Sequence, residues 1–169
     1  MQPDRGILQI IKAAAAAKVK FVIAGFGPLV ELLKSQGEKE EFVKFRGKVS
    51  YNEALAIEKN ALAILALYDP EIPNNQFAAP NKLYEAMMLG KPIITTSGTS
   101  AGKVVEAEGI GIIVTYGDIK ALTKALIFLK NNSSQREQMG QRARMLYDKQ
   151  YSFVKQSQKL QLAYKALIK

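Results

Sequence analysis

Apolar residues in this chain gather in short runs, separated by longer segments with a helical period. The five apolar runs lie at residues 19–25, 42–47, 62–67, 91–96 and 111–117. Each run is short and mostly apolar, as in parallel strands that are covered by helices on both faces. The alternation of strands and helices predicts an α/β fold: a doubly wound, mostly parallel, Rossmann-like sheet with right-handed crossovers.

Capping signals mark where several of the helices begin. Ser50 and Glu53 have the spacing of a capping box, which opens the helix after the second run. Ser134 and Glu137 repeat this spacing before a helix predicted over 135–149. The other long helices are predicted over 28–37, over 117–132 beginning at Asp118, and over 153–168 with an amphipathic pattern.

The chain enters its first helix almost at once, at about Gly6, and no strand comes before it. A doubly wound sheet normally feeds its first helix from a strand. Either the fold begins with this helix, or a strand is missing from the chain. We favour the second interpretation, so we expect about five strands where a complete sheet has six.

Composition fits a single domain over residues 1–169, because 48% of the 169 residues are hydrophobic and 23% are charged. The formal net charge of +9 favours anionic partners such as nucleotides. The basic residues are spread along the chain and are not interleaved with aromatic residues, so nucleic acid is not the expected partner.

Several kinds of chemistry are excluded by absent residue types. The chain has no Cys and no His, which removes disulfides, thiol chemistry, the usual zinc sites and acid–base catalysis by His. No apolar run reaches the roughly 20 residues that a membrane-spanning helix needs.

The first of three candidate phosphate sites is the segment 24–30, which follows a predicted strand and opens a helix. The third glycine of a dinucleotide fingerprint would stand at position 30, which is Val30. The acidic residue that binds the ribose in that motif is also absent about 20 residues further on. Gly25 and Gly27 therefore either permit a tight turn or allow the backbone to approach a ligand closely.

The second candidate is the segment 98–104, which imitates a P-loop after the fourth run. Only three residues separate Gly98 from Gly102, and Val104 follows Lys103 where the motif needs Ser or Thr. We therefore expect a flexible loop that could donate backbone N–H groups to an anion.

The third candidate is a short helix that starts at Pro80 or Asn81. A helix amino terminus attracts phosphates, and Lys82 adds a positive charge in the first turn. Glu85 lies one turn further on, where its carboxylate could accept hydrogen bonds from vicinal hydroxyls such as those of a ribose. The structural alternative is that Glu85 complements the helix dipole and forms a buried ion pair with Lys82. Spacing alone does not separate the two interpretations.

The order of several motifs along the chain favours the interpretation in which Glu85 contacts a ribose. The segments "FVIAGFGP", "FVKFRGKVSYNEA" and "PNKLYEAMMLGKPII" together resemble the C-terminal, donor-binding half of the family 4 glycosyltransferases of GT-B fold. The resemblance covers essentially the whole chain, and the third segment is its most specific part.

The resemblance implies roles for individual residues. Glu85 would accept hydrogen bonds from the ribose of a nucleotide-sugar donor, and Arg5 would bind the diphosphate. The glycine turn at Gly25 and Gly27, and the segment around Val49, would flank the base. Backbone groups of the loop and helix start would hold the diphosphate and the sugar: Ala79, Pro80, Asn81, Lys82 and Leu83.

The chain also departs from the family pattern. The first Glu of the Glu-x7-Glu signature would stand at position 77, which is Phe77, and the usual Gly-Phe-Gly is replaced by Ala78, Ala79 and Pro80. We interpret this as a variant donor loop. The contact to the sugar that the first Glu normally makes stays unassigned.

The resemblance further implies a retaining transfer of a hexose from a UDP- or GDP-sugar to a glycan or lipid-linked acceptor. It implies no metal and no cofactor other than the donor. The N-terminal acceptor domain of such enzymes is not in this chain, which alone would bind nucleotide weakly. A cytoplasmic location is expected, with contact to the inner face of a membrane left open. The alternatives are a GT-B UDP-sugar epimerase, which the absence of His disfavours, and a non-catalytic nucleotide-binding or partner-docking domain.

The missing strand is normally central in the strand order 3-2-1-4-5-6. Its absence would leave two strand edges exposed. We therefore expect the chain either to receive a strand from another copy or another chain, or to rearrange its sheet.

Overall fold

The computed structural model describes residues 2–37 and 41–167. All five predicted strands are present, each shorter than its apolar run. They are β1 (Phe21–Ile23), β2 (Val43–Phe45), β3 (Ile64–Ala66), β4 (Ile93–Thr96) and β5 (Gly111–Val114).

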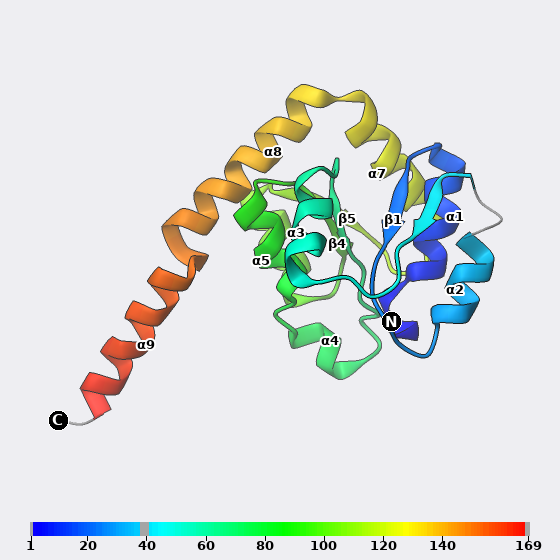
Figure 1. Cartoon of the computed structure of the whole chain (residues 1–169). Helices are drawn as coiled ribbons and strands as arrows, with labels where there is room; N and C mark the ends of the chain where they lie inside the picture. The colour runs from blue at the N-terminus through cyan, green and yellow to red at the C-terminus, as the bar shows by residue number, and fades with distance from the viewer. Residues whose placement is uncertain (1, 38–40, 168–169) are drawn as a thin grey trace.

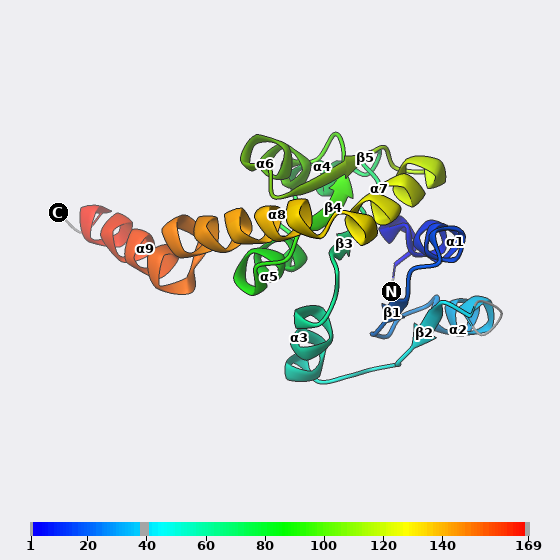
Figure 2. The ribbon, with the colours of Figure 1, turned by 90° about the horizontal axis from the view of Figure 1, so that it is seen from above.

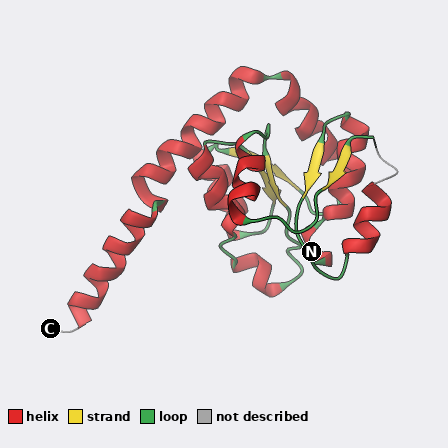
Figure 3. Cartoon of the chain, in the orientation of Figure 1, coloured by secondary structure: helices red, strands yellow, loops and turns green. Residues whose placement is uncertain are grey.

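Helices connect the strands and extend the chain beyond the last one (Figures 1 and 3). A 3-10 turn, η1 (Pro3–Arg5), leads into α1 (Ile7–Ala17) at Gly6, as predicted. The segment between β3 and α5, expected to be a loop, contains the short helix α4. The other helical elements are α2 (Val30–Gly37), α3 (Tyr51–Lys59), α4 (Pro73–Phe77), α5 (Asn81–Leu89), α6 (Ser100–Glu108), α7 (Ile119–Asn131), α8 (Ser133–Leu146), η2 (Tyr147–Tyr151) and α9 (Phe153–Leu167).

The strands form two parallel sheets. One has the order β1-β2 and the other has the order β3-β4-β5. Phe21 is in register with Val43 in the first sheet, and Ile93 lies between Ile64 and Gly111 in the second. The α/β, mostly parallel fold class is confirmed. The described strands form two separate sheets and not one continuous sheet in another order. The two unpaired strand edges that we expected are therefore present, on β1 and β3.

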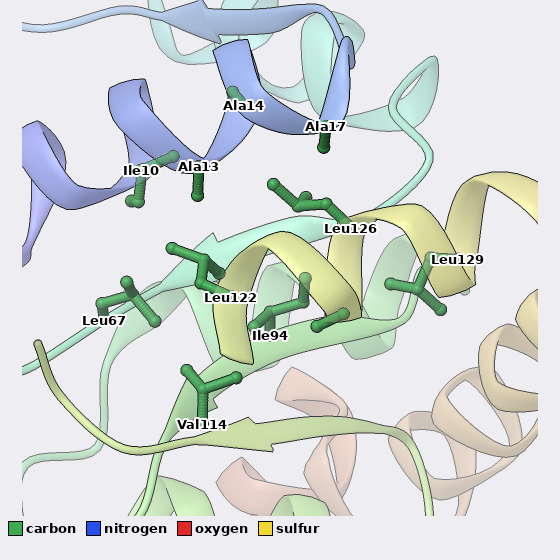
Figure 4. Packing of buried hydrophobic residues seen from close by; sticks show 11 residues of the cluster. Ile10, Ala13, Ala14, Ala17, Leu67, Ile94, Val114, Leu122, Leu126 and Leu129 are labelled. Carbon is green, nitrogen blue, oxygen red and sulfur yellow. The ribbon is translucent and has the colours of Figure 1, made fainter. Parts of the chain in front are cut away.

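The larger sheet is covered on both faces. On one face α1 and α7 pack together through small and branched side chains, with Ala13 and Ala17 of α1 facing Leu122 and Leu126 of α7 (Figure 4). On the other face, side chains of α5, α6 and α8 surround Ile93. The buried alanines of α1 allow close approach to α7.

Of the three predicted side-chain caps, two form and one does not. Ser50 and Glu53 form the predicted capping box, and the Asp118 side chain accepts a hydrogen bond from the N–H of Ala121 at the start of α7. The box at Ser134 does not form, because α8 already begins at Ser133, directly after the single residue that separates it from α7. Ser134 is thus inside the first turn of α8 and not in front of it.

The prediction of a flexible loop over 98–104 is also wrong. This segment starts α6, with Thr99 as its N-cap: the Thr99 side chain accepts a hydrogen bond from the N–H of Gly102 at 3.0 Å. A Cβ on Gly102 would lie 2.4 Å from the carbonyl oxygen of Thr96. Gly102 is therefore needed for close packing of α6 on the end of β4, and the likeness to a P-loop reflects this packing.

The last helix, α9, extends away from the rest of the chain (Figures 1 and 2). None of its described residues is buried, and Phe153 and Leu167 are both 82% exposed. Among the described residues, no helix is both long enough and apolar enough to span a bilayer.

Candidate functional site

The amino terminus of α5 is the structural centre of the candidate site. Pro80, the N-cap, is extended and buried, and no side chain caps the helix. The N–H of Leu83 donates to the Pro80 carbonyl at 3.0 Å, and the Leu83 side chain packs in the core. Pro80 itself has no N–H to donate. The first-turn N–H groups that point outward therefore belong to Asn81 and Lys82, and Asn81 is exposed.

Lys82 is shared by two carboxylates. Its ammonium donates to Oε2 of Glu85 at 2.8 Å and to Oε1 of Glu58, which reaches it from α3. The side chain of Lys82 is 41% exposed, whereas those of Glu58 and Glu85 are 12% and 9% exposed. Slight burial and the neighbouring Glu85 carboxylate raise the pKa of Tyr51, which lies on the same face of α3 as Glu58. The ion pair expected as the structural alternative for Glu85 is thus present, with a second acid added to it.

Burial and charge act against each other in this cluster. Burial raises the pKa of the Glu58 carboxyl above its ordinary value, since it outweighs the opposing hydrogen bond and charge of Lys82. Burial also disfavours the charged form of Lys82, but the hydrogen bonds to Glu58 and Glu85 outweigh it and raise the pKa of this ammonium. The second oxygen of Glu58, Oε2, is buried without a hydrogen-bond partner. The cluster therefore favours the charged form of Lys82 and disfavours the charged form of Glu58.

Arg5 lies near the carboxyl end of β3. Its guanidinium carbon is 4.2 Å from the centre of the Tyr68 ring, and its Nε is 3.6 Å from Oδ2 of Asp4. Asp4 is fixed in turn, because its carbonyl accepts from the N–H of Asp69 and its carboxylate accepts from Asn75. The start of the chain is therefore held against the loop that follows β3.

Arg5, Tyr68 and Lys82 line one cavity of about 800 Å³, to which both sheets contribute side chains. We call it the inter-sheet cavity. Two of the predicted diphosphate-binding residues, Arg5 and Lys82, thus line the same cavity although 77 positions separate them in the sequence. The lining also includes Lys20, Lys44 and Arg46 and the carboxylate Glu58. A cavity with several cations can bind a group with several negative charges.

The other predicted residues lie outside this lining. Gly25 and Gly27 have φ angles of 142° and 138°, which side chains rarely adopt, so the turn after β1 requires glycine. The N–H of Gly25 donates to the Gly47 carbonyl at 2.7 Å and ties this turn to the segment that contains the half-buried Val49. Neither glycine nor Val49 belongs to the described residues that line the cavity.

Sequence reasoning missed two residues of the cluster. Glu58 and Tyr51 are seven positions apart in a correctly predicted helix, so they share one face, but nothing in the sequence indicated what that face contacts. Phe77, at the position of the family's first Glu, is at the end of α4 and 78% exposed.

Comparison with known proteins identifies the family and the fold of this chain. The model of the family described as "Glycosyl transferases group 1" matches residues 1–146. The chain belongs to this family. Its relatives include the phosphatidyl-myo-inositol mannosyltransferase of Mycobacterium leprae, which is 29% identical over 141 residues, or 80% of this chain and 36% of that protein.

Solved structures of glycosyltransferases share the GT-B fold of this domain. Anabaena Alr3699/HepE in complex with UDP-glucose superposes with a TM-score of 0.80 at 19% identity, over 98% of this chain and 46% of that one. Sucrose-phosphate synthase from Thermosynechococcus elongatus gives 0.77 at 18% identity, over 99% of this chain and 43% of that one. The group 1 glycosyl transferase chain described here thus spans less than half the length of each of these proteins.

Proposed function

We propose that this chain is the donor-binding part of a retaining glycosyltransferase that moves a hexose from a UDP- or GDP-sugar to a glycan or lipid-linked acceptor. The observation that carries the proposal is the meeting of Arg5 and Lys82 at one cavity, beside the amino terminus of α5. The acceptor site and the rest of the catalytic apparatus would come from a further domain. Neither a metal nor a cofactor is part of the proposal.

The physical logic is electrostatic. When a nucleotide sugar gives up its sugar, negative charge grows on the leaving diphosphate. Cations and helix N–H groups that are already in place stabilise that charge without a cost of reorganisation at the moment of reaction. Arg5, Lys82 and the N–H groups at Asn81 and Lys82 would supply this effect.

Glu85 has a separate role in the proposal. Its carboxylate would accept hydrogen bonds from the ribose hydroxyls and so fix the nucleoside relative to the diphosphate. In the structure it accepts a hydrogen bond from Lys82. Donor binding would therefore turn Lys82 towards the phosphates and leave Glu85 to the ribose.

The relatives support the nucleotide-sugar part of this proposal. Alr3699/HepE was solved with UDP-glucose, with UDP and glucose, and with UDP. The M. leprae relative is a mannosyltransferase by name. The comparison with relatives does not identify the residues that determine the base, sugar and acceptor. The binding experiment therefore includes both UDP and GDP.

The experiment is a thermal shift measurement with UDP, GDP and ATP. A ligand that binds only the folded state raises the melting temperature by mass action, so one diphosphate should raise it by several degrees and ATP should not. Glu85→Ala should abolish the shift, and Glu106→Ala, an exposed carboxylate on α6, should keep it. Absence of a shift with any nucleotide would favour the partner-docking alternative.

A further inference from the structure

Asn75 is a buried amide in a short helix that otherwise lies at the surface. Of the five residues of α4, all of them described in the structure, Asn75 alone is buried, with 3% of its surface exposed. Burying an amide costs free energy unless its donors are hydrogen-bonded. An apolar side chain would suit this position better if it only had to fill space. The hydrogen bonds of Asn75 therefore explain its burial.

The amide of Asn75 joins three segments of the chain. Its Nδ2 donates to Oδ2 of Asp4 at 3.0 Å and to the carbonyl of Asp69 at 3.1 Å. Both N–H donors of the amide are thus used. The N–H of Asp69 in turn donates to the carbonyl of Asp4 at 3.0 Å. The start of the chain, the loop after β3 and α4 are therefore tied together at one point.

The carboxylate of Asp4 also contacts Arg5. The oxygen that accepts from Asn75, Oδ2, lies 3.6 Å from Nε of Arg5, whose guanidinium also lies over the ring of Tyr68. The side chain of Asp4 is the less exposed of the pair, at 17% against 38% for Arg5. An ion pair as exposed as this adds little stability, but it orients the guanidinium. The direction of Arg5 therefore depends on where Asn75 holds Asp4.

Asn75 also holds the loop that leads into α5. It stands five positions before Pro80, the N-cap of that helix. A second hydrogen bond from α4, donated by Nε2 of Gln76 to the carbonyl of Pro70 at 2.8 Å, secures the same turn. The proposed diphosphate site combines Arg5 with the start of α5. Asn75 is connected to both parts, to Arg5 through Asp4 and to α5 through the chain.

We propose that Asn75 is a positioning residue for the diphosphate of the nucleotide-sugar donor. Through Asp4 it sets the direction of the Arg5 guanidinium, and through α4 it anchors the loop before Asn81 and Lys82. It acts on the diphosphate through these groups and does not touch it. An arginine that is already oriented does not have to be ordered when the ligand binds, which favours binding. This inference rests on the proposed function, because it assigns Asn75 to the same donor site.

The test replaces the donor of this hydrogen bond by an acceptor. Asn75→Asp keeps the size of the side chain but places a carboxylate against Oδ2 of Asp4, beyond which lies Arg5, and against the carbonyl of Asp69. At about pH 8 the two carboxylates repel each other, so the affinity for UDP or GDP should fall about three- to tenfold in isothermal titration calorimetry. At about pH 5 the two carboxyls share a proton, so the ratio of the two affinities, original to variant, should approach one.

The matched control is the neighbouring residue of the same helix. Asn74→Asp adds the same charge at an exposed position of α4. It should leave the affinity unchanged at both pH values. In the ligand-free chain Asn75→Asp should also shift the NMR signal of the Arg5 Nε–H group, and Asn74→Asp should not. This signal separates an effect on Arg5 from a general loss of stability.

A further measurement needs no variant. In an NMR titration of the full chain, the diphosphate that binds should shift the side-chain N–H signals of Asn75 and Arg5 with the same dissociation constant as the backbone amide of Asn81. The side-chain amide of Asn132, which bonds to the carbonyl of Phe128 at 2.8 Å, is the internal control and should not shift.

The outcomes distinguish this inference from the proposed function. If the original chain binds neither nucleotide, the proposed function is wrong and this inference with it. Three results would overturn the inference alone: binding that Asn75→Asp leaves unchanged at the higher pH, an equal loss of affinity at both pH values, or a nucleotide that shifts Asn81 without shifting Asn75. If Asn75→Asp does not fold, the titration of the original chain decides.

Discussion

The ammonium of Lys82 lies 2.8 Å from Oε2 of Glu85, and Glu58 binds the same ammonium from the facing helix α3. One cation is therefore shared by two largely buried carboxylates at the start of a helix. Without ligand, this cluster has a net negative charge, which opposes binding of a diphosphate. In the proposed donor site Lys82 would bind the diphosphate, so Glu58, which binds the same ammonium, would compete with the diphosphate for it.

The first prediction concerns this competition. Glu58→Gln removes the competing charge and keeps the size of the side chain, so the affinity for UDP or GDP should increase about three- to tenfold, equivalent to the roughly 1 kcal/mol of a partly exposed ion pair. Isothermal titration calorimetry would measure it. Glu106→Gln changes the net charge equally and should leave the affinity unchanged. Weaker binding by Glu58→Gln would show that Glu58 supports the site.

A second prediction follows from the raised pKa of Glu58. Burial outweighs the attraction of Lys82, so the Glu58 carboxyl holds its proton more tightly in the folded chain than in the unfolded chain. In the unfolded chain its pKa has the ordinary value of 4.5. Ionisation of Glu58 therefore costs stability as the pH rises from about 4 through the folded pKa. The Glu58→Gln variant has no carboxyl to ionise at this position, so it does not lose this stability as the pH rises.

The difference in melting temperature, variant minus original, should thus be near zero at about pH 4 and positive at about pH 7. Thermal unfolding followed by circular dichroism across this range would measure the difference. A difference that becomes negative as the pH rises would mean that the Lys82 ion pair outweighs the burial of Glu58.

A third prediction concerns Lys82 itself. Lys82→Met leaves Glu58 and Glu85 facing each other without a cation, so the chain should lose about 1–2 kcal/mol of unfolding free energy, a modest loss because Lys82 is partly exposed. Urea denaturation would measure the loss, and it should shrink at low pH as the acids become protonated. Lys103→Met, on the exposed side of α6, should change stability by less than about 0.5 kcal/mol.

The fourth prediction concerns Gly102, whose added Cβ would meet the carbonyl of Thr96 at 2.4 Å. Gly102→Ala should destabilise the chain by about 1–3 kcal/mol, because α6 must move away from the end of β4. Lys103→Ala, in the same turn, should affect neither stability nor nucleotide binding. Loss of nucleotide binding in Lys103→Ala, measured by calorimetry, would instead support a phosphate-binding role for this segment.

Much of the fold was predictable because it depends on local pattern. The apolar runs gave the strands, and Ser50, Glu53 and Asp118 gave helix starts that form as expected. The failures at Ser134 and Gly102 have one cause. Both segments carry a local signal that a neighbouring element overrides: α7 passes almost directly into α8, and β4 fixes how closely α6 must pack.

The candidate site was predictable only in part. The order of the motifs indicated Arg5, Lys82 and Glu85 as site residues. In the structure Arg5 and Lys82 line one cavity. The contact of Glu58 with Lys82 joins residues 24 positions apart on two helices, and no periodicity within either helix indicates it. Such pairings depend on how elements pack, which local sequence does not encode.

The most direct test of donor binding is an NMR titration of the full chain with UDP and with GDP, which detects weak binding residue by residue. The account predicts saturable shifts at the backbone amides of Asn81 and Lys82 and near Arg5 with one of the two nucleotides, and the loss of these shifts in Glu85→Ala. Saturating nucleotide that leaves the start of α5 unchanged, or that shifts it equally in Glu85→Ala, would contradict the account.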